Sequence, residues 1–410
     1  MKRYLHGIHV AGHKTTAQMS AVKLPLPDSV VIPMAMHIGA PAKPVVKVGD
    51  YVKTGQLIGE PGGFVSAPIY ASVSGTVKKI GEMLGSNGRM MQTVEIESDG
   101  LDARWEGIAP PKLETMQDFL DAVRASGLVG LGGAGFPTVV KLTVKNLDQI
   151  KCVIINGAEC EPYITSDTRA MIDYSFDVIA GCRLLQKFLK VPRIVFGIED
   201  NKPEAIQALK DHQLDGIVLD VLPAKYPQGA EKQLIYAVTG REVPSGGLPA
   251  AVGCAVFNAA TTRAIHDVVY DGMPLIKRIV TVSGDILMEP KNLLVPIGTS
   301  FNDLLDACGH SENPYKVLSG GPMMGVAQYD LSVPTIKGVN AVTVLGKKNN
   351  FFVDEPHCLR CGKCIEVCPM HLMPVLMYQA TQDGDVDGMK SVNLLDCIEC
   401  GCCAYGCPAG

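Results

Sequence analysis

Apolar residues recur at helical spacing in the segment "LETMQDFLDAVRASG", which begins at Leu113. Residues three and four positions apart share one face of a helix. The spacing therefore predicts an amphipathic helix whose buried face carries five side chains: Leu113, Met116, Phe119, Leu120 and Val123.

Short apolar runs then alternate with helical patterns. "KCVIING" at Lys151–Gly157, "RIVFGI" at Arg193–Ile198 and "GIVLDVL" have the length and bulk of buried strands, and helices are expected around Tyr174–Leu189 and from Pro203. Strands separated by helices favour a parallel sheet.

Two further regions have a different pattern. Val31–Glu97 contains short strands at regular spacing with glycine turns, which predicts a small β-rich sandwich. The region from about 275 to 345 shows strand, strand, helix and then the glycine-rich "LSGGPMMG", which predicts a small α+β module. That glycine segment lacks the Lys-Ser/Thr ending of a phosphate loop, so a structural turn is expected.

Composition places the chain among soluble globular proteins. Of 410 residues, 47% are apolar and 19% charged, and the net charge of −5 comes with no basic block, which argues against nucleic acid as a partner. Lys2 and Arg3 precede no apolar segment, so no signal peptide is expected. The uncharged run Val243–Thr262 contains two prolines and several glycines, which argues against a membrane span and favours a buried loop with a strand or helix.

Most of the fourteen cysteines lie in one block near the end of the chain. "CLRCGKCIEVCP" follows the pattern C-x2-C-x2-C-x3-C-P, and "CIECGCCAYGCP" repeats it. Three closely spaced thiolates wrap one face of a 4Fe–4S cubane, and the proline sends the fourth to the other cluster. We therefore expect one cluster on Cys358, Cys361, Cys364 and Cys407, and a second on Cys397, Cys400, Cys403 and Cys368.

Zinc is the alternative metal, because it also binds four thiolates in C-x2-C pairs. A zinc site needs neither a third cysteine at the same spacing nor a following proline, whereas both motifs contain them. Cys402 is out of register and is expected to be a bystander. The five cysteines elsewhere have no paired spacing, so they indicate buried thiols in a reducing compartment, with cytoplasm as the default.

A glycine-rich segment, "GLVGLGGAGFPTVVK", follows the first predicted helix. Gly130, Gly132 and Gly135 fit G-x-G-x-x-G, but a dinucleotide fingerprint should follow a strand, and here a helix precedes it. Bare backbone there would let a phosphate or a flat ring approach, with Lys141 supplying charge. A tight turn for helix packing explains the segment equally well.

Polar residues follow the first predicted strand of the α/β region. Asn156, Glu159 and Glu161 lie where the strand "KCVIING" ends, and ligands of α/β sheets bind at the carboxyl ends of strands. We expect a binding site there.

Four motifs, "GLGGAGFPT", "NGAECEP", "YPQGAEKQLI" and "FNAATT", stand in this order ahead of the paired cysteine motifs. Together with the opening "GIHVAGHKTTA", they resemble RnfC, the peripheral NADH-binding subunit of the Rnf complex, a membrane ferredoxin:NAD oxidoreductase. The flavin region is more distantly similar to the FMN-bearing, NADH-binding subunit of respiratory complex I. The resemblance covers essentially the whole chain.

The resemblance implies FMN and NAD(H) as ligands and assigns residues to them. Those matching the flavin and nucleotide loop are Gly130, Gly132, Gly133, Gly135 and Lys141. Asn156 and Glu159 match residues that line FMN. Phe136 matches an aromatic residue that stacks on NADH, and Glu161 and Glu231 match acidic residues near the nucleotide. Further flavin-lining matches are Gly229, Asn258 and Thr261.

The chain also departs from these relatives. Leu131 stands where complex I has an arginine, and Ala158 and Ala230 stand where it has acids, so a less charged flavin pocket is expected. The β-rich part resembles a lipoyl or biotinyl carrier fold, but its hairpin reads "GGFVSAP" without an attachment lysine. We expect a scaffold that carries neither lipoate nor biotin.

The sequence thus predicts a multidomain α/β protein with four parts. These are an N-terminal segment and β-rich lipoyl-like sandwich (1–98), a Rossmann-like FMN/NADH domain (99–273), a small β-grasp domain (274–346) and an α-helical two-cluster ferredoxin domain (347–410). No acid–base catalytic residue is assigned, because the cofactors perform the chemistry.

The expected function is hydride exchange with NAD(H) through FMN and single-electron transfer through the clusters. By resemblance, the chain works peripherally on the cytoplasmic side of the membrane, with other Rnf subunits moving Na+ or H+. The alternatives are a soluble NADH diaphorase of similar build that feeds another reductase, and a non-enzymatic electron relay without flavin.

Overall fold

The computed structural model describes residues 6–86, 88–143, 149–349 and 357–409. One part of it is a four-stranded sheet with the order β11-β10-β9-β12 and only parallel pairs. Its strands are β9 (Cys152–Gly157), β10 (Ile194–Glu199), β11 (Ile217–Leu222) and β12 (Cys254–Asn258). This confirms the predicted parallel sheet.

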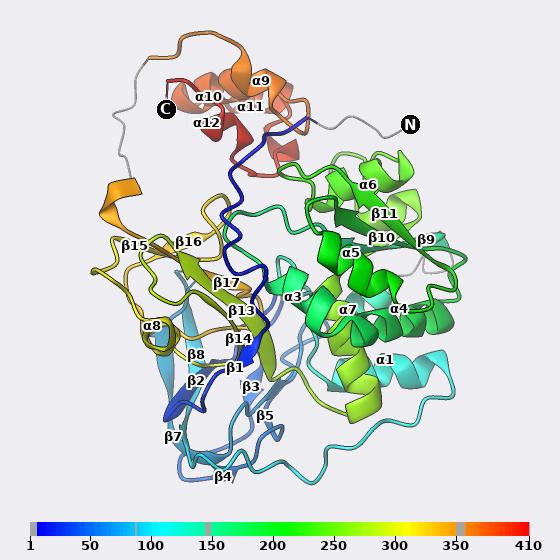
Figure 1. Ribbon diagram of the computed structural model, residues 1–410, viewed down its shortest axis with the longest axis vertical. Coiled ribbons are helices and arrows are strands. Elements are labelled where there is room, and N and C mark those ends of the chain that lie inside the picture. Colours follow the sequence, from blue (N-terminus) through cyan, green and yellow to red (C-terminus); the bar gives the residue numbers. More distant parts are fainter. Residues whose placement is uncertain (1–5, 87, 144–148, 350–356, 410) are drawn as a thin grey trace.

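Helices flank this sheet (Figure 1). They are α1 (Met116–Ala125), α2 (Thr138–Leu142), α3 (Ser166–Asp173), α4 (Ser175–Leu189), α5 (Pro203–Lys210), α6 (Glu231–Thr239) and α7 (Ala259–His266). Helix α1 begins later than the apolar pattern predicts, because Thr115 and Asp118 form a capping box that fixes its first turn. Phe119, Leu120 and Val123 are buried as expected.

The β-rich region consists of two small sheets. One has the order β2-β8-β7-β4, with β2 (Ser29–Pro33), β4 (Tyr51–Val52), β7 (Gly75–Leu84) and β8 (Met90–Ser98). The other has the order β3-β5-β6, with β3 (Lys43–Pro44), β5 (Leu57–Glu60) and β6 (Ile69–Tyr70). Val30, Ile32, Ile58, Ile69 and Ile96 are fully buried, which is the expected core of a sandwich.

A six-stranded mixed sheet has the order β1-β14-β13-β17-β15-β16 and carries α8 (Phe301–Cys308). Its strands are β1 (Val22–Lys23), β13 (Lys277–Gly284), β14 (Lys291–Pro296), β15 (Lys316–Ser319), β16 (Val326–Gln328) and β17 (Ala341–Leu345). Strand β1 pairs in parallel with β14, so the N-terminal segment joins a sheet formed almost entirely by residues far along the chain.

The cysteine-rich part contains α9 (Lys363–Glu366), α10 (Pro374–Gln382), α11 (Val386–Ser391) and α12 (Cys402–Tyr405). A short turn of this part is η5 (Leu394–Asp396), and short turns elsewhere are η2 (Pro249–Val252), η3 (Asp267–Asp271) and η4 (Lys347–Asn349). In Figure 1 the cysteine-rich part sits at one end of the molecule, beside the N-terminal segment and near α6. Within the described residues, none of the helices has the length and apolar character needed to cross a membrane.

Candidate functional site

A cleft of about 850 Å³ opens where β9 and β12 end. It joins segments from every part of the chain: the glycine loop, the residues after β9, the turn at Tyr226–Ala230, the turn at Ser319–Val326, and Ile398 and Cys400 of the cysteine-rich part. Eight predicted ligand residues line it: Gly132, Gly133, Gly135, Asn156, Glu159, Glu161, Gly229 and Asn258.

The glycine loop is a closed turn between α1 and α2. The Gly130 amide donates to the Phe136 carbonyl oxygen at 2.9 Å, and Val129 forms a bridge with Pro137. Gly135 has a φ of +66°, a left-handed conformation that favours glycine. A methyl group on Gly133 would meet no heavy atom of the described residues within 4 Å, so the loop presents open backbone to the cleft.

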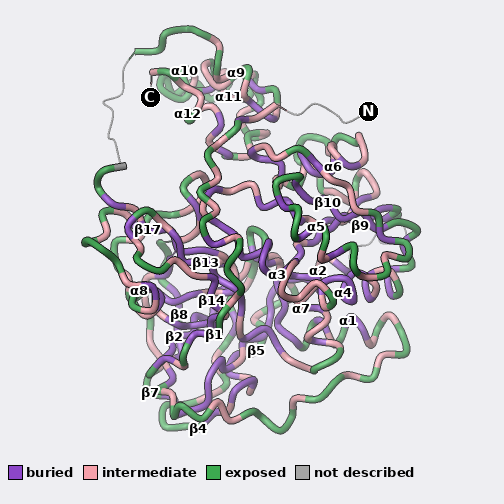
Figure 2. The backbone as a smooth tube through the Cα atoms, in the orientation of Figure 1, coloured by how far each residue is buried: buried purple, intermediate pink, exposed green. Residues whose placement is uncertain are grey.

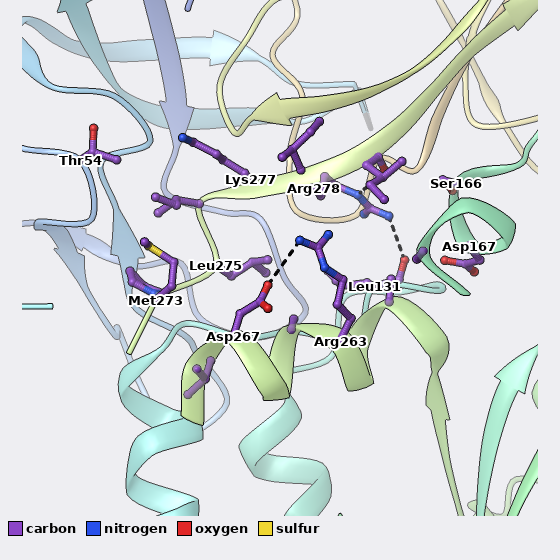
Figure 3. A pocket seen from close by; sticks show the side chains of 18 of the residues that line it. Thr54, Leu131, Ser166, Asp167, Arg263, Asp267, Met273, Leu275, Lys277 and Arg278 are labelled. Carbon is purple, nitrogen blue, oxygen red and sulfur yellow. Dashed lines mark hydrogen bonds and ion pairs between the residues drawn. The ribbon is translucent and has the colours of Figure 1, made fainter. Parts of the chain in front are cut away.

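Other residues hold this loop from behind. The Leu131 amide donates to Thr261 Oγ1 at 3.0 Å, and Arg278 Nη2 donates to the Leu131 carbonyl oxygen at 3.3 Å. Figure 3 shows this contact between Arg278 and Leu131, which both line a second cavity of about 350 Å³, and the ion pair of Arg263 with Asp267 in the same lining. Burial lowers the pKa of Arg278 to about 10. Thr261 therefore supports the loop and does not line the cleft.

The segment after β9 is fixed by polar contacts at each predicted position. Asn156 Nδ2 donates to the Gly229 carbonyl oxygen at 2.8 Å and ties β9 to the neighbouring turn. The Glu159 carboxylate accepts from the Asp167 amide at 2.7 Å and from Thr168 Oγ1 at 2.7 Å, at the start of α3. A carboxylate is favourable there because the first amides of a helix lack backbone partners.

Lys14 holds the same segment from the N-terminal side. Its ammonium donates to the carbonyl oxygens of Glu159, Glu161 and Ile164 at 2.8, 2.7 and 2.5 Å. Burial lowers its pKa. Sequence reasoning did not single out Lys14, although it lies within the "GIHVAGHKTTA" motif.

Glu161 reaches across the cleft to the turn "SGGPMMG". Its Oε1 accepts from the amides of Met323 and Met324 at 2.6 and 3.2 Å, and burial raises its pKa. This contact brings the six-stranded sheet to the cleft, which the turn also lines, and the structural role expected for the turn stays a prediction.

Lys141 and Glu231 lie outside the cleft lining and contact each other. Lys141 Nζ is 3.3 Å from Glu231 Oε1 and donates to the Val256 carbonyl oxygen at 2.7 Å. Gly130 and Phe136 are also absent from the lining, because they close the base of the glycine loop.

Asp167 is a further cleft residue that the sequence did not indicate. Asn258 Nδ2 donates to its Oδ2 at 2.6 Å, while its buried Oδ1 has no hydrogen-bond partner among the described residues. Burial, with the Glu159 carboxylate nearby, raises its pKa to about 7. An acceptor atom without a partner, next to open glycine backbone, fits a ligand that is flat and carries hydroxyl groups. FMN is both flat and hydroxylated.

The two cysteine motifs form the same turn twice. Arg360 and Glu399 have φ values of +53° and +55°, and their amides donate to Cys358 Sγ and Cys397 Sγ at 3.4 Å each. Gly362 and Gly401 follow with φ values of +77° and +74° and begin α9 and α12. Amides pointed at sulfur in repeated turns fit thiolate ligands of iron–sulfur clusters.

The cysteine-rich part also lacks an ordinary core. In residues 357–409 the buried positions are Cys368, Pro369, Leu372, Met377, Cys400 and Cys402, and Figure 2 shows most of this part exposed or intermediate. A module of this size with so few buried side chains is expected to depend on metal for its stability. The residues present therefore fit two clusters.

Four family models match successive parts of the chain. Residues 2–101 match the RnfC barrel sandwich hybrid domain, residues 123–267 the Nuo51 FMN-binding domain, residues 279–327 the SLBB domain and residues 350–408 the 4Fe-4S dicluster domain. Among solved structures, an NAD+-reducing [NiFe]-hydrogenase in the H2-reduced state aligns with 64% of this chain and 50% of its own, at 20% identity and a TM-score of 0.48.

Three relatives align over nearly the full chain, and each is the C subunit of its complex. The relative from the proton-translocating ferredoxin:NAD(+) oxidoreductase complex of Clostridium ljungdahlii is 47% identical, with 97% of this chain and 88% of the relative covered. The one from the Na(+)-translocating complex of Acetobacterium woodii is 44% identical, with 95% and 91% covered. The one from the ion-translocating oxidoreductase complex of Pseudomonas aeruginosa is 41% identical, with 94% and 51% covered. The chain therefore belongs to the RnfC family of the ion-translocating ferredoxin:NAD(+) oxidoreductase complexes.

Proposed function

We propose that this chain is the flavin and iron–sulfur subunit through which such a complex exchanges electrons with NAD(H). The observation that carries the proposal is a single cleft lined by both the glycine loop and Cys400, because a flavin held at the loop would then lie beside a cluster ligand. FMN, when bound, exchanges two electrons with NAD(H) and single electrons with iron–sulfur clusters.

The site residues have different proposed roles in holding FMN and NAD(H). Open backbone at Gly132, Gly133 and Gly135 admits the ring or phosphate, and Asn156, Glu159, Gly229 and Asn258 shape the walls. Glu161 closes the side that faces the six-stranded sheet. Lys141 and Glu231 form an ion pair outside the lining, so their proposed contacts with NAD(H) require that pair to open. Gly130, Phe136 and Thr261 fix the loop.

The cluster ligands are proposed as two crossed sets. Cys358, Cys361 and Cys364 with Cys407 hold one cluster, and Cys397, Cys400 and Cys403 with Cys368 hold the other. The proposed partners are the other Rnf subunits, both membrane-embedded and ferredoxin-accepting, with this chain bound peripherally on the cytoplasmic side. Coupling to Na+ or H+ movement belongs to those subunits.

We further propose that the chain divides into four domains at the boundaries 1–98, 99–273, 274–346 and 347–410. The lipoyl-like sandwich, Rossmann-like, β-grasp and ferredoxin-type folds are assigned to them in that order. Separate sheets and separate cysteine-rich helices support this division, with one exception: β1 of the N-terminal segment joins the sheet of residues 274–346.

Anaerobic titration with NADH tests the function. Protein reconstituted with FMN and iron, with both quantified, should lose flavin and cluster absorbance together. Bleaching of neither chromophore would refute the proposal, and protein that holds iron but no flavin would favour the non-enzymatic relay. Retention in a membrane fraction separates a subunit of the complex from the soluble diaphorase.

A further inference from the structure

The two cysteine motifs form matching turns but lie in different surroundings. The first cysteine of each motif, Cys358 or Cys397, is exposed, but at the second position Cys361 is exposed whereas Cys400 is buried and lines the cleft. Cys368, which the crossed pattern assigns to the second cluster, is buried as well. Since the local turns are alike, the difference comes from what packs against each motif.

An apolar cluster packs against the second motif. Its buried members are Ile8, Tyr226, Cys400 and Cys402, and its partly buried members are Val10, Cys160, Met323, Val367 and Ile398. Tyr226, Cys160, Ile398 and Cys400 also line the cleft. The second motif therefore borders the cleft directly through Ile398 and Cys400, with Tyr226 and Cys160 beside them.

Tyr226 makes the polar contacts across this boundary. Its hydroxyl donates to the Cys400 carbonyl oxygen at 2.8 Å, and its own backbone exchanges two hydrogen bonds with Ile8, at 2.9 and 3.0 Å. The Tyr226 side chain is only 3% exposed. A buried hydroxyl with a single well-placed acceptor fixes the two groups relative to each other.

Packing on Tyr226 also explains the small side chain of Cys402. It is fully buried, with Sγ 3.9 Å from the Tyr226 carbonyl oxygen. The first motif has the exposed Lys363 at the equivalent position. A small apolar side chain is required where α12 packs on Tyr226, whereas an exposed position in the first motif accepts a long charged one.

From these contacts, and resting on the function proposed above, we propose that Tyr226 is a positioning residue for the cluster of Cys397, Cys400, Cys403 and Cys368. This cluster is the first to exchange electrons with the flavin site. The cluster of Cys358, Cys361, Cys364 and Cys407 comes second and faces outward to the partner.

The electron count closes within the chain. Oxidation of one NADH to NAD+ yields two electrons and releases one proton to solvent. The electrons leave the cleft singly. The first passes through the cluster beside Tyr226 to the outer cluster, and the second stays on the inner one, so that one NADH reduces both clusters by one electron each.

Matched cysteine variants test the order in the holoprotein. Cys361→Ser and Cys400→Ser alter equivalent positions of the two motifs. NADH should still reduce the inner cluster of Cys361→Ser, as seen by electron paramagnetic resonance. In Cys400→Ser the outer cluster should be reduced by dithionite but no longer by NADH. The reverse pattern, or NADH reduction of the remaining cluster in both variants or in neither, overturns the order.

Tyr226→Phe tests the positioning role without touching a ligand, and it keeps the proposal testable if Cys400→Ser does not fold. The substitution removes the hydroxyl group, and with it the positive end of an O–H dipole close to one cluster. Nearby dipoles and hydrogen bonds tune the reduction potential of a cluster. A redox titration should show one cluster signal moving to lower potential, with iron and FMN contents unchanged. Tyr329→Phe, at a residue 81% exposed, is the control.

The outcomes separate the two proposals. If NADH fails to bleach the flavin of the unaltered protein, the proposed function is wrong. If the flavin bleaches but Tyr226→Phe leaves both cluster potentials in place, or moves both equally, the role of Tyr226 is wrong while the function stands.

Discussion

Single polar residues decide the shape of the cleft, and the half-buried Lys14 is the strongest case. One ammonium holds three carbonyl oxygens of the segment after β9, where a change in backbone position would displace Glu159 and Glu161 together. The side chain does not line the cleft, so its effect on a ligand is exerted through the backbone.

Lys14→Met should therefore lower the free energy of unfolding by about 2 kcal/mol or more, because unpaired buried carbonyls cost about 1–3 kcal/mol each. It should also weaken FMN binding. Thermal denaturation and flavin content measure the two effects. Lys23→Met is the control: Lys23 forms an exposed ion pair with Asp102 at 3.6 Å, and such pairs contribute about 0–1 kcal/mol. Equal losses in the two variants would contradict this role of Lys14.

Asp167 gives the molecule a pH dependence. The folded state keeps the proton on Asp167 up to a pKa of about 7, whereas the unfolded chain loses it near the usual aspartate pKa of 3.8. Between these values the folded state binds more protons, so its stability falls as pH rises.

Asp167→Asn should remove that part of the slope, since the amide cannot ionise and its oxygen still accepts from Asn258. Anaerobic melting temperatures between about pH 5.5 and pH 7 provide the measurement, in the window set by the raised pKa. Asp215→Asn, at an exposed residue, checks that the change belongs to the buried position. An unaltered slope in Asp167→Asn would show that another group is responsible.

At the scale of elements, the glycine loop is set by its contact with the start of α7. A methyl group on Gly132 would come within 2.7 Å of Asn258 Nδ2, and Asn258 Oδ1 accepts from the Ala260 amide at 2.9 Å to cap α7. Gly133, one residue on, faces open space among the described residues. The adjacent glycines thus serve different purposes.

Gly132→Ala should displace the cap of α7 and lower the free energy of unfolding by about 1 kcal/mol, the usual value of an N-cap. Gly133→Ala should leave stability unchanged and weaken only FMN binding, because its methyl group fills space that the ligand needs. Denaturation and flavin titration of the two variants separate these effects. Full FMN affinity in Gly133→Ala would argue against close approach of the ligand there.

The elements themselves were largely predictable, because their signals are local. The apolar runs of β9, β10 and β11, the helical spacing of α1 and the repeated cysteine spacing each lie within a few residues. The contacts that shape the cleft are not local. Nothing near Glu161 in sequence indicates that it accepts hydrogen bonds from Met323, and nothing near Lys141 indicates its contact with Glu231. Such pairs follow only from how the sheets pack.

At the scale of the whole molecule, the cysteine-rich part is held against α6 and the segment after it by one buried and one exposed hydrogen bond. Gln233 Nε2 donates to the Pro369 carbonyl oxygen at 2.9 Å and is buried, whereas Ser245 Oγ donates to Asp396 Oδ1 at 2.6 Å at an exposed site. A buried acceptor that loses its donor costs free energy, while an exposed one turns to water. Of these two contacts, the Gln233 one therefore contributes more to the docking, alongside the buried hydrogen bond from Tyr226 to Cys400.

Gln233→Leu should loosen the cysteine-rich part while leaving iron content intact. Loss of the donor to the buried Pro369 carbonyl oxygen should cost about 1–3 kcal/mol. Amide hydrogen exchange in residues 369–377 and in α6 should therefore become about tenfold faster or more. NADH-driven cluster reduction should slow, because the second cysteine motif spends less time at the cleft, whereas reduction by dithionite should not change. Ser245→Ala, which alters only the exposed contact, should match the unaltered protein in every measurement. If Gln233→Leu also matches it, the contacts around Tyr226 hold the cysteine-rich part without help from Gln233.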